Sequence, residues 1–209
     1  MKRDGCKTAV ILAVLVLGGC SGPSSTSSPK TETKEAAAPP APVTAKTAYW
    51  EMYKLAYQWD HDAHPLSIKE GSVPGITNAD GKAGLWEAQF GAVGKKQARK
   101  FTYCVLDKPP DFSKGVNVDN PVPWLGPTRD AMTFTSSDFA TDSDAAYATA
   151  HEAAAKWLAK HPDAPRTDME LGSSARYRGP VWFILWGTKK DGYVAIISAA
   201  SGKPFKEKE

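Results

Sequence analysis

The order of elements expected in residues 47–106 returns in residues 143–205, and this repetition restricts the folds that the chain can adopt. In each stretch a helical pattern precedes a short strand, a strand that carries a tryptophan, a Lys-Lys pair and a final aromatic strand. The tryptophans at matching places are Trp59 and Trp157, 98 residues apart, and Trp86 and Trp182, 96 residues apart. Internal similarity at a nearly constant offset is typical of a duplicated structural unit. We therefore expect two α-β-β-β units.

Each unit contains one amphipathic helix, because apolar residues recur at steps of three and four. The two apolar stripes are Tyr49, Met52, Tyr53, Ala56 and Trp59, and Tyr147, Ala150, Ala154, Trp157 and Leu158. Strands are expected at residues 66–68, 85–90, 101–106, 169–171, 181–186 and 193–197. A helix with one apolar face must bury that face against another element. The predicted class is α+β: each helix packs on a small antiparallel sheet, and the two units pair into one compact body, since about 60 residues would be marginally stable alone.

The segment between the units, residues 107–142, is rich in Pro, Asp, Ser and Thr and shows no clear period. A connection of this length inside a compact domain usually marks a linker or a functional loop. It contains Trp124, which has a proline on either side of it at positions 123 and 127. Two interpretations stay open for Trp124: it anchors a partner, as exposed aromatic residues do at interfaces, or it holds the connector against the sheet.

The second unit resembles a PepSY-type domain, in which an Ala-rich helix opened by Ser or Asp precedes a three-stranded antiparallel sheet. The matching residues are those at the helix start (142–146), those on the middle strand (180–182) and the turn formed by residues 200–203 after the last strand. Ser201 replaces the usual Thr of that turn, and Ser198 stands where the family often has Asp. The resemblance implies a non-enzymatic module outside the cytoplasm that regulates peptidases or contacts other proteins.

The N-terminus has the organisation of a secretory signal. Lys2, Arg3 and Lys7 precede an apolar run from Ala9 to Leu17, which is shorter than the roughly 20 residues that a membrane-spanning helix needs. The sequence Leu-Gly-Gly-Cys at positions 17–20 resembles a bacterial lipobox. The resemblance implies cleavage of residues 1–19, acylation of Cys20 (with palmitate among the expected modifications) and attachment of the mature protein to a membrane. Ser21 in place of Asp weakly implies the outer membrane.

Residues 20–46 are expected to form a disordered tether between the anchor and the first unit, because they contain too little apolar surface to fold, and residues 206–209 are expected to be a short tail. Removal of the signal lowers the formal charge from +3 to about +1, which provides no electrostatic basis for nucleic-acid binding. Cys6 leaves with the signal and Cys20 carries lipid, so Cys104 has no partner for a disulfide within the mature chain. Its β-rich surroundings predict burial.

No motif in the sequence indicates catalysis, and we expect neither a catalytic residue nor a cofactor nor a metal. The predicted function is a lipid-anchored interaction or regulatory module of the cell envelope, facing the periplasm or the cell surface, with a protein partner. One alternative is a periplasmic hydrolase or metal-dependent enzyme that uses His61 and His64, which lie one helical turn apart in Asp-His-Asp-Ala-His. Another alternative is the binding of cell-wall glycan through exposed tryptophans.

Overall fold

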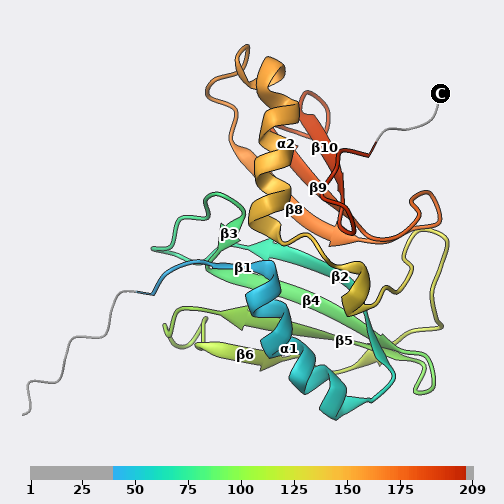
Figure 1. Cartoon of the computed structure of the whole chain (residues 1–209). Helices are drawn as coiled ribbons and strands as arrows, with labels where there is room; N and C mark the ends of the chain where they lie inside the picture. Colours follow the sequence, from blue (N-terminus) through green and yellow to red (C-terminus); the bar gives the residue numbers. More distant parts are fainter. Residues whose placement is uncertain (1–39, 206–209) are drawn as a thin grey trace, which may run out of the picture. The chain divides into compact units, whose positions relative to one another are not determined.

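One antiparallel sheet of eight strands runs through both halves of the chain (Figure 1). The computed structural model describes residues 40–205. The strands follow the spatial order β10-β9-β8-β2-β4-β5-β6, and β7 pairs with β5 beside β6. Their bounds are β2 (Ala63–Gly71), β4 (Leu85–Ala92), β5 (Gln97–Cys104), β6 (Gly115–Val118), β7 (Val122–Pro123), β8 (Arg166–Gly172), β9 (Val181–Trp186) and β10 (Tyr193–Ser198). A separate two-stranded ladder joins β1 (Val43–Thr44) to β3 (Lys82–Ala83).

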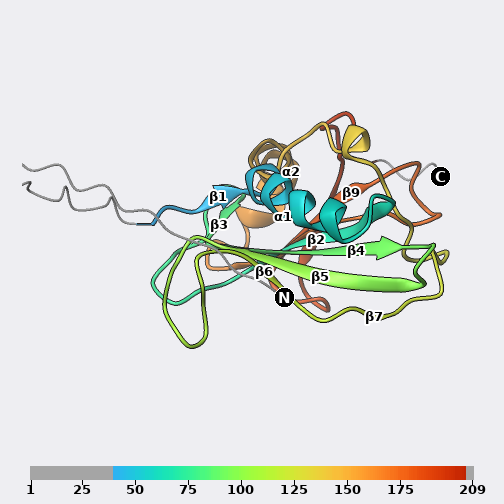
Figure 2. The ribbon, with the colours of Figure 1, turned by 90° about the horizontal axis from the view of Figure 1, so that it is seen from below.

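The structure confirms the α+β class and shows how the two halves meet. Helix α1 (Ala45–Trp59) packs on β2, β4 and β5, and helix α2 (Ser143–Leu158) packs on β9 and β10. Both helices lie on the same face of the sheet (Figure 2). The first strands of the two units, β2 and β8, pair antiparallel with Ile68 opposite Leu171, so the two small sheets join edge to edge into one. We call the β2–β8 junction the seam.

The two halves repeat the same local packing around the tryptophans of their second strands. Trp86 on β4 and Trp182 on β9 are fully buried, and their ring centroids lie 6.4 Å apart in an edge-on arrangement. The indole N–H of Trp86 donates to the carbonyl of Val43 at 2.9 Å, and that of Trp182 donates to the carbonyl of Thr141 at 3.0 Å. Each acceptor lies one residue before the N-cap of the helix in the same half. In each half, therefore, the buried indole N–H is satisfied by the backbone carbonyl just before the helix N-cap.

The N-termini of the two helices meet at a single carboxylate. Asp142, the N-cap of α2, accepts from the backbone N–H of Ser143 at 2.7 Å and from that of Lys46 in α1 at 2.9 Å, through the same oxygen. The Ser143 hydroxyl accepts from the N–H of Ala45 at 2.8 Å. The first turn of each helix leaves backbone N–H groups without intrahelical partners, so residues of the second half satisfy donors of the first.

Several elements extend beyond their expected bounds. Strand β2 covers nine residues where a short strand at 66–68 is expected, and β5 begins at Gln97, so that Arg99 and Lys100 lie in the strand. Strand β1 and the first residues of α1 lie within the segment expected to be a tether. The connector contains β6, β7 and the short 3₁₀ helix Ser136–Asp138, none of which shows a periodic apolar pattern. Among residues 40–205, no helix is long and apolar enough to span a membrane.

Candidate functional site

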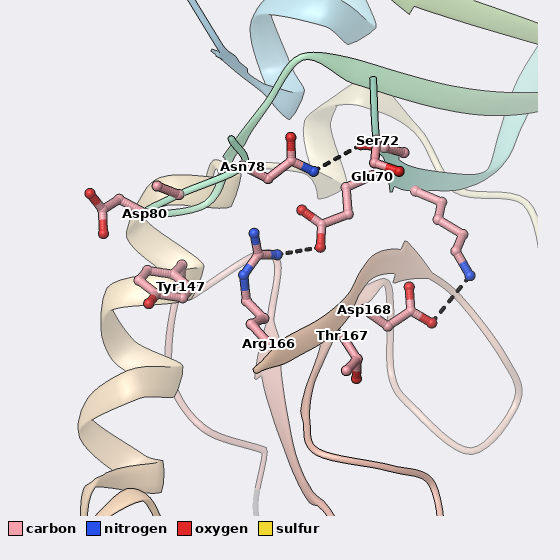
Figure 3. Close-up of a pocket in the computed structure, with 11 residues that line it drawn as sticks. Glu70, Ser72, Asn78, Asp80, Tyr147, Arg166, Thr167 and Asp168 are labelled. Atoms are coloured by element: carbon pink, nitrogen blue, oxygen red, sulfur yellow. Dashed lines mark hydrogen bonds and ion pairs between the residues drawn. The ribbon is translucent and has the colours of Figure 1, made fainter. Parts of the chain in front are cut away.

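A polar pocket of about 530 Å³ opens at one end of the seam (Figure 3). We call it the seam pocket. Its walls come from the end of β2, the loop at residues 78–80, the first turns of α2 and the start of β8, so both halves contribute. The lining residues are Lys69, Glu70, Gly71, Ser72, Asn78, Ala79, Asp80, Tyr147, Arg166, Thr167 and Asp168.

A buried ion pair forms the wall of the seam pocket. Nη1 of Arg166 donates to Oε1 of Glu70, and only about a tenth of either side chain is exposed (10% and 9%). The guanidinium of Arg166 also lies over the ring of Tyr147, 5.5 Å from its centroid. Oε2 of Glu70 is buried and has no hydrogen-bond partner among the described residues. Burial raises the pKa of Glu70 above its ordinary value, and the hydrogen bond and charge of Arg166 offset only part of this effect.

A second pair of charges closes the opposite side of the seam pocket. Nζ of Lys69 lies 3.1 Å from a carboxylate oxygen of Asp168 and 4.0 Å from one of Glu170. Burial alone would lower the pKa of Lys69, but the hydrogen bond and charge of Asp168 lead to a net rise. The charged groups of β2 and β8 in this pocket are therefore paired with one another across the seam, which favours a structural role for them.

A different hollow lies on the sheet face that carries no helix. It measures about 490 Å³, and we call it the open-face hollow. Strands β2, β4, β8 and β9 form its floor, and residues of the connector and of the segment after β8 form its rim. The lining residues are Leu66, Ser67, Gln89, Trp124, Asp130, Ala131, Glu170, Gly172, Ser173, Ser174 and Phe183.

Backbone hydrogen bonds fix the rim of the open-face hollow. The N–H of Trp124 donates to the carbonyl of Lys96 at 2.9 Å. Further along the connector, the N–H of Met132 donates to Ser173 at 2.9 Å, and the N–H of Ala175 donates back to Arg129 at 2.8 Å. The connector is thus tied to the first half near Trp124 and to the second half near Ser173. These hydrogen bonds explain how a long segment without a periodic apolar pattern is held in place inside a folded domain.

Trp124 rests on the sheet at Gly91. A Cβ added at Gly91 would lie 2.6, 2.7 and 3.0 Å from three adjacent atoms of the six-membered ring of Trp124. Similar distances to three adjacent ring atoms indicate that the ring face, and not its edge, covers Gly91. The indole is half-buried, so the connector is held against the sheet at this position while part of the ring lines the hollow. Contact between Trp124 and a partner stays a prediction.

Most polar side chains of the open-face hollow, unlike the charged pairs of the seam pocket, have no partner among residues 40–205. Five side chains that line the hollow make no hydrogen bond or ion pair with this part of the chain: Ser67, Gln89, Asp130, Ser173 and Ser174. Glu170 lies 4.0 Å from Lys69. Burial raises the pKa of Glu170, although the charge of Lys69 opposes the rise. Among the described residues, neither lysine nor arginine lines the hollow.

The other residues singled out by the sequence lie apart from these two sites. Cys20 is outside the described residues. The ring of His61 lies against that of Tyr57, with centroids 4.5 Å apart and planes tilted by 46°, whereas Nε2 of His64 lies 3.3 Å from Asp62. No group of three or more potential metal ligands is present among residues 40–205. Cys104 is buried, as predicted, in a small apolar cluster with Val73 and Leu85.

Apart from Trp124, the residues that line the two hollows are not singled out by the sequence as site residues. In the seam pocket, Glu70 carries a recognisable signal. Ile68 and Glu70 share one face of β2 by strand alternation, and Ile68 is buried in the core. A charged residue two positions after a buried one on the same strand face indicates a paired charge at the edge of the core. Gln89, Ser173 and the other residues of the open-face hollow carry no such signal, because they meet only after the two halves and the connector have folded together.

The sequence matches no protein-family model and no curated protein. Among solved structures, the chain is similar to a protein from Clostridium difficile 630 that is described as a "putative lipoprotein". The TM-score is 0.44 at 10% sequence identity, and the alignment covers 80% of this chain and 91% of the other.

Proposed function

We propose that this protein is a lipid-anchored, non-enzymatic interaction module of the cell envelope. The signal-like N-terminus and the Leu-Gly-Gly-Cys sequence ending at Cys20 support the anchor. Acyl chains on Cys20 would hold the protein at a membrane, and more than one chain is needed for stable attachment. The resemblance of the second half to PepSY-type domains supports a role in contact with other proteins.

The observation that carries the interaction role is the exposed apolar part of the connector around Leu125. Leu125 is 96% exposed, although it directly follows the half-buried Trp124. Val122, three residues earlier on β7, is 50% exposed. Single exposed apolar residues are common on protein surfaces. Two of them within four residues of a segment that is fixed to the sheet are suited to contact with a protein partner.

The anchor is tested by following Cys20 in a bacterial host. We expect the full-length chain to incorporate a fatty-acid label, to fractionate with membranes and to lose its first 19 residues. The variant Cys20→Ala should incorporate no label. Cys104→Ala, which removes the buried cysteine, is the matched control and should be labelled like the wild type. Equal labelling of Cys20→Ala and the wild type would refute the anchor.

The partner surface is tested by cross-linking in intact cells. A photoreactive side chain at position 125 should give a discrete cross-linked protein product, whereas one at Val93 should not. Val93 is a suitable control because it is 48% exposed at the β4–β5 turn and lies outside the connector. Leu125→Asp should remove the product formed from a probe at position 122, and Val93→Asp should leave it. Identical products from positions 125 and 93 would contradict the proposed surface.

A further inference from the structure

We propose that the open-face hollow is a binding site for a neutral saccharide. This goes beyond the proposed function, because the hollow and the exposed side chain of Leu125 are different parts of the surface. The hollow has a volume of about 490 Å³, which is within the range of about 300–1,000 Å³ found for small-molecule sites. It is therefore large enough for a sugar unit and open enough for a chain to continue beyond it.

The aromatic residues of the hollow suit the apolar faces of a sugar ring. Trp124 and Phe183 both line the hollow, and they come from the connector and from β9. Gly91 supports one face of Trp124, so the indole is held in place before any ligand arrives. Phe183 and Tyr177 form a T-shaped ring pair with centroids 5.5 Å apart, which restricts the position of Phe183. Fixed aromatic side chains bind at a low entropic cost.

The polar residues of the hollow suit hydroxyl groups. A sugar hydroxyl is both donor and acceptor, and the hollow offers both kinds of partner. Gln89 can donate and accept, the three serine hydroxyls can do either, and the carboxylates of Asp130 and Glu170 accept. Gln89, Asp130 and the three serines have no side-chain partner within residues 40–205, so a ligand would replace water at these groups without breaking hydrogen bonds within that part of the protein.

Charge distinguishes a neutral saccharide from other ligands of similar size. Among residues 40–205, the lining contains two carboxylates and no lysine or arginine, so the hollow would repel phosphates and acidic sugars. Its many polar groups also make it a poor site for an acyl chain. A neutral polyol carries no negative charge for the carboxylates to repel, and its hydroxyl groups can bond with the polar groups of the hollow.

The hollow is formed jointly by both halves of the chain and by the connector. Ser67 and Gln89 belong to the first half, Glu170 and Phe183 belong to the second, and Trp124 comes from the connector. Neither half alone can form the site. The connector brings the aromatic side chain of Trp124 to the rim of a hollow whose floor contains strands of both halves.

The test is a titration of the detergent-solubilised full-length protein with neutral tetrasaccharides of N-acetylglucosamine, glucose, mannose and galactose, followed by tryptophan fluorescence and calorimetry. We expect saturable binding of at least one of them and much weaker binding of a tetramer of galacturonic acid. Trp124→Ala should weaken binding by roughly tenfold or more, the loss of one well-placed contact. Trp50→Ala is the matched control, because Trp50 is 44% exposed on α1, on the opposite face of the sheet.

Two further variants separate a site effect from misfolding. Gln89→Ala removes polar contacts only, and Gly91→Val displaces the indole; both should weaken binding while circular dichroism shows an intact fold. Leu125→Asp should leave saccharide binding unchanged, so that a failed cross-link at position 125 counts against the protein partner alone. Absence of saturable binding by all four neutral tetramers, or an equal loss in Trp50→Ala and Trp124→Ala, would overturn the saccharide site and leave the proposed function standing.

Discussion

Glu70 shows how a single residue connects the two halves of the fold. It follows Ile68 on the face of β2 that packs against the core, and only 9% of its side chain is exposed. Its only partner among the described residues is Arg166 of the other half, and one of its oxygens has none. Removing one member of a buried ion pair leaves the other charge uncompensated. The pair therefore favours a specific register between β2 and β8.

The raised pKa of Glu70 makes a prediction about the pH dependence of stability. In the pH range between the ordinary glutamate pKa of about 4.3 and the higher value in the folded protein, the folded state binds more protons than the unfolded state. The free energy of unfolding must then rise as the pH falls through this range. In Glu70→Gln this contribution is absent. We expect the wild type to gain stability relative to Glu70→Gln as the pH is lowered from neutral.

This prediction is checked by urea unfolding of both proteins at several pH values. Glu51→Gln, at an exposed position of α1, is the control and should follow the pH profile of the wild type. A stability difference between the wild type and Glu70→Gln that does not change with pH would show that burial of Glu70 is not coupled to its protonation.

At the scale of the elements, one carboxylate serves the N-termini of both helices, in addition to Thr44, the N-cap of α1. Oδ1 of Asp142 accepts from the first turn of α1 as well as from the start of α2. The N-terminus of a helix carries a partial positive charge, and two such ends close together would repel each other without an anion between them. Asp142 supplies the anion and the hydrogen bonds together.

Asp142→Ala should therefore destabilise the protein more than the loss of an ordinary cap. Loss of one N-cap costs about 0.5–2 kcal/mol, and because two helices are affected we expect about 2–3 kcal/mol. Asp144→Ala is the matched control: Asp144 is in the first turn of α2, but within residues 40–205 its side chain accepts only from the N–H of Ala145. Thermal and urea unfolding measure both values. Equal losses in the two variants would mean that Asp142 does not serve α1.

The helices, most strands and the cap of α2 could be predicted because each leaves a local pattern. The steps of three and four at Tyr49 and Met52, and the apolar run of Val181–Trp186, record which face of an element is buried. No local sequence pattern indicates the pairing of β2 with β8, since it depends on two segments about 100 residues apart. The open-face hollow is even harder to predict. Gln89 and Ser173 are polar residues with no distinctive pattern, and they form a site with Trp124 only after the connector has folded onto the sheet.

At the scale of the whole fold, the seam is narrow but is supported on both faces of the sheet. Only three residue pairs form the ladder between β2 and β8. On the helix face, Trp86 touches Trp182, and Phe139 of the connector lies 5.7 Å from both Tyr49 and Trp182, measured between ring centroids. On the open face, the connector is hydrogen-bonded to both halves. The two units therefore share one core, which includes residues of both halves.

Because the core is shared, neither half should fold alone. Residues 40–127 and 128–205, produced separately, each keep one unit but lose the seam, the shared aromatic contacts and, for α1, the cap from Asp142. Small domains of this size bury little of their surface and are marginal even when complete. We expect no cooperative thermal transition in near-ultraviolet circular dichroism for either fragment. Refolding the two together should restore a transition, since the break falls in the connector and leaves every strand intact. A cooperative transition in one isolated fragment, close to that of the whole chain, would show that the repeat is an independent domain and that the seam joins two finished structures.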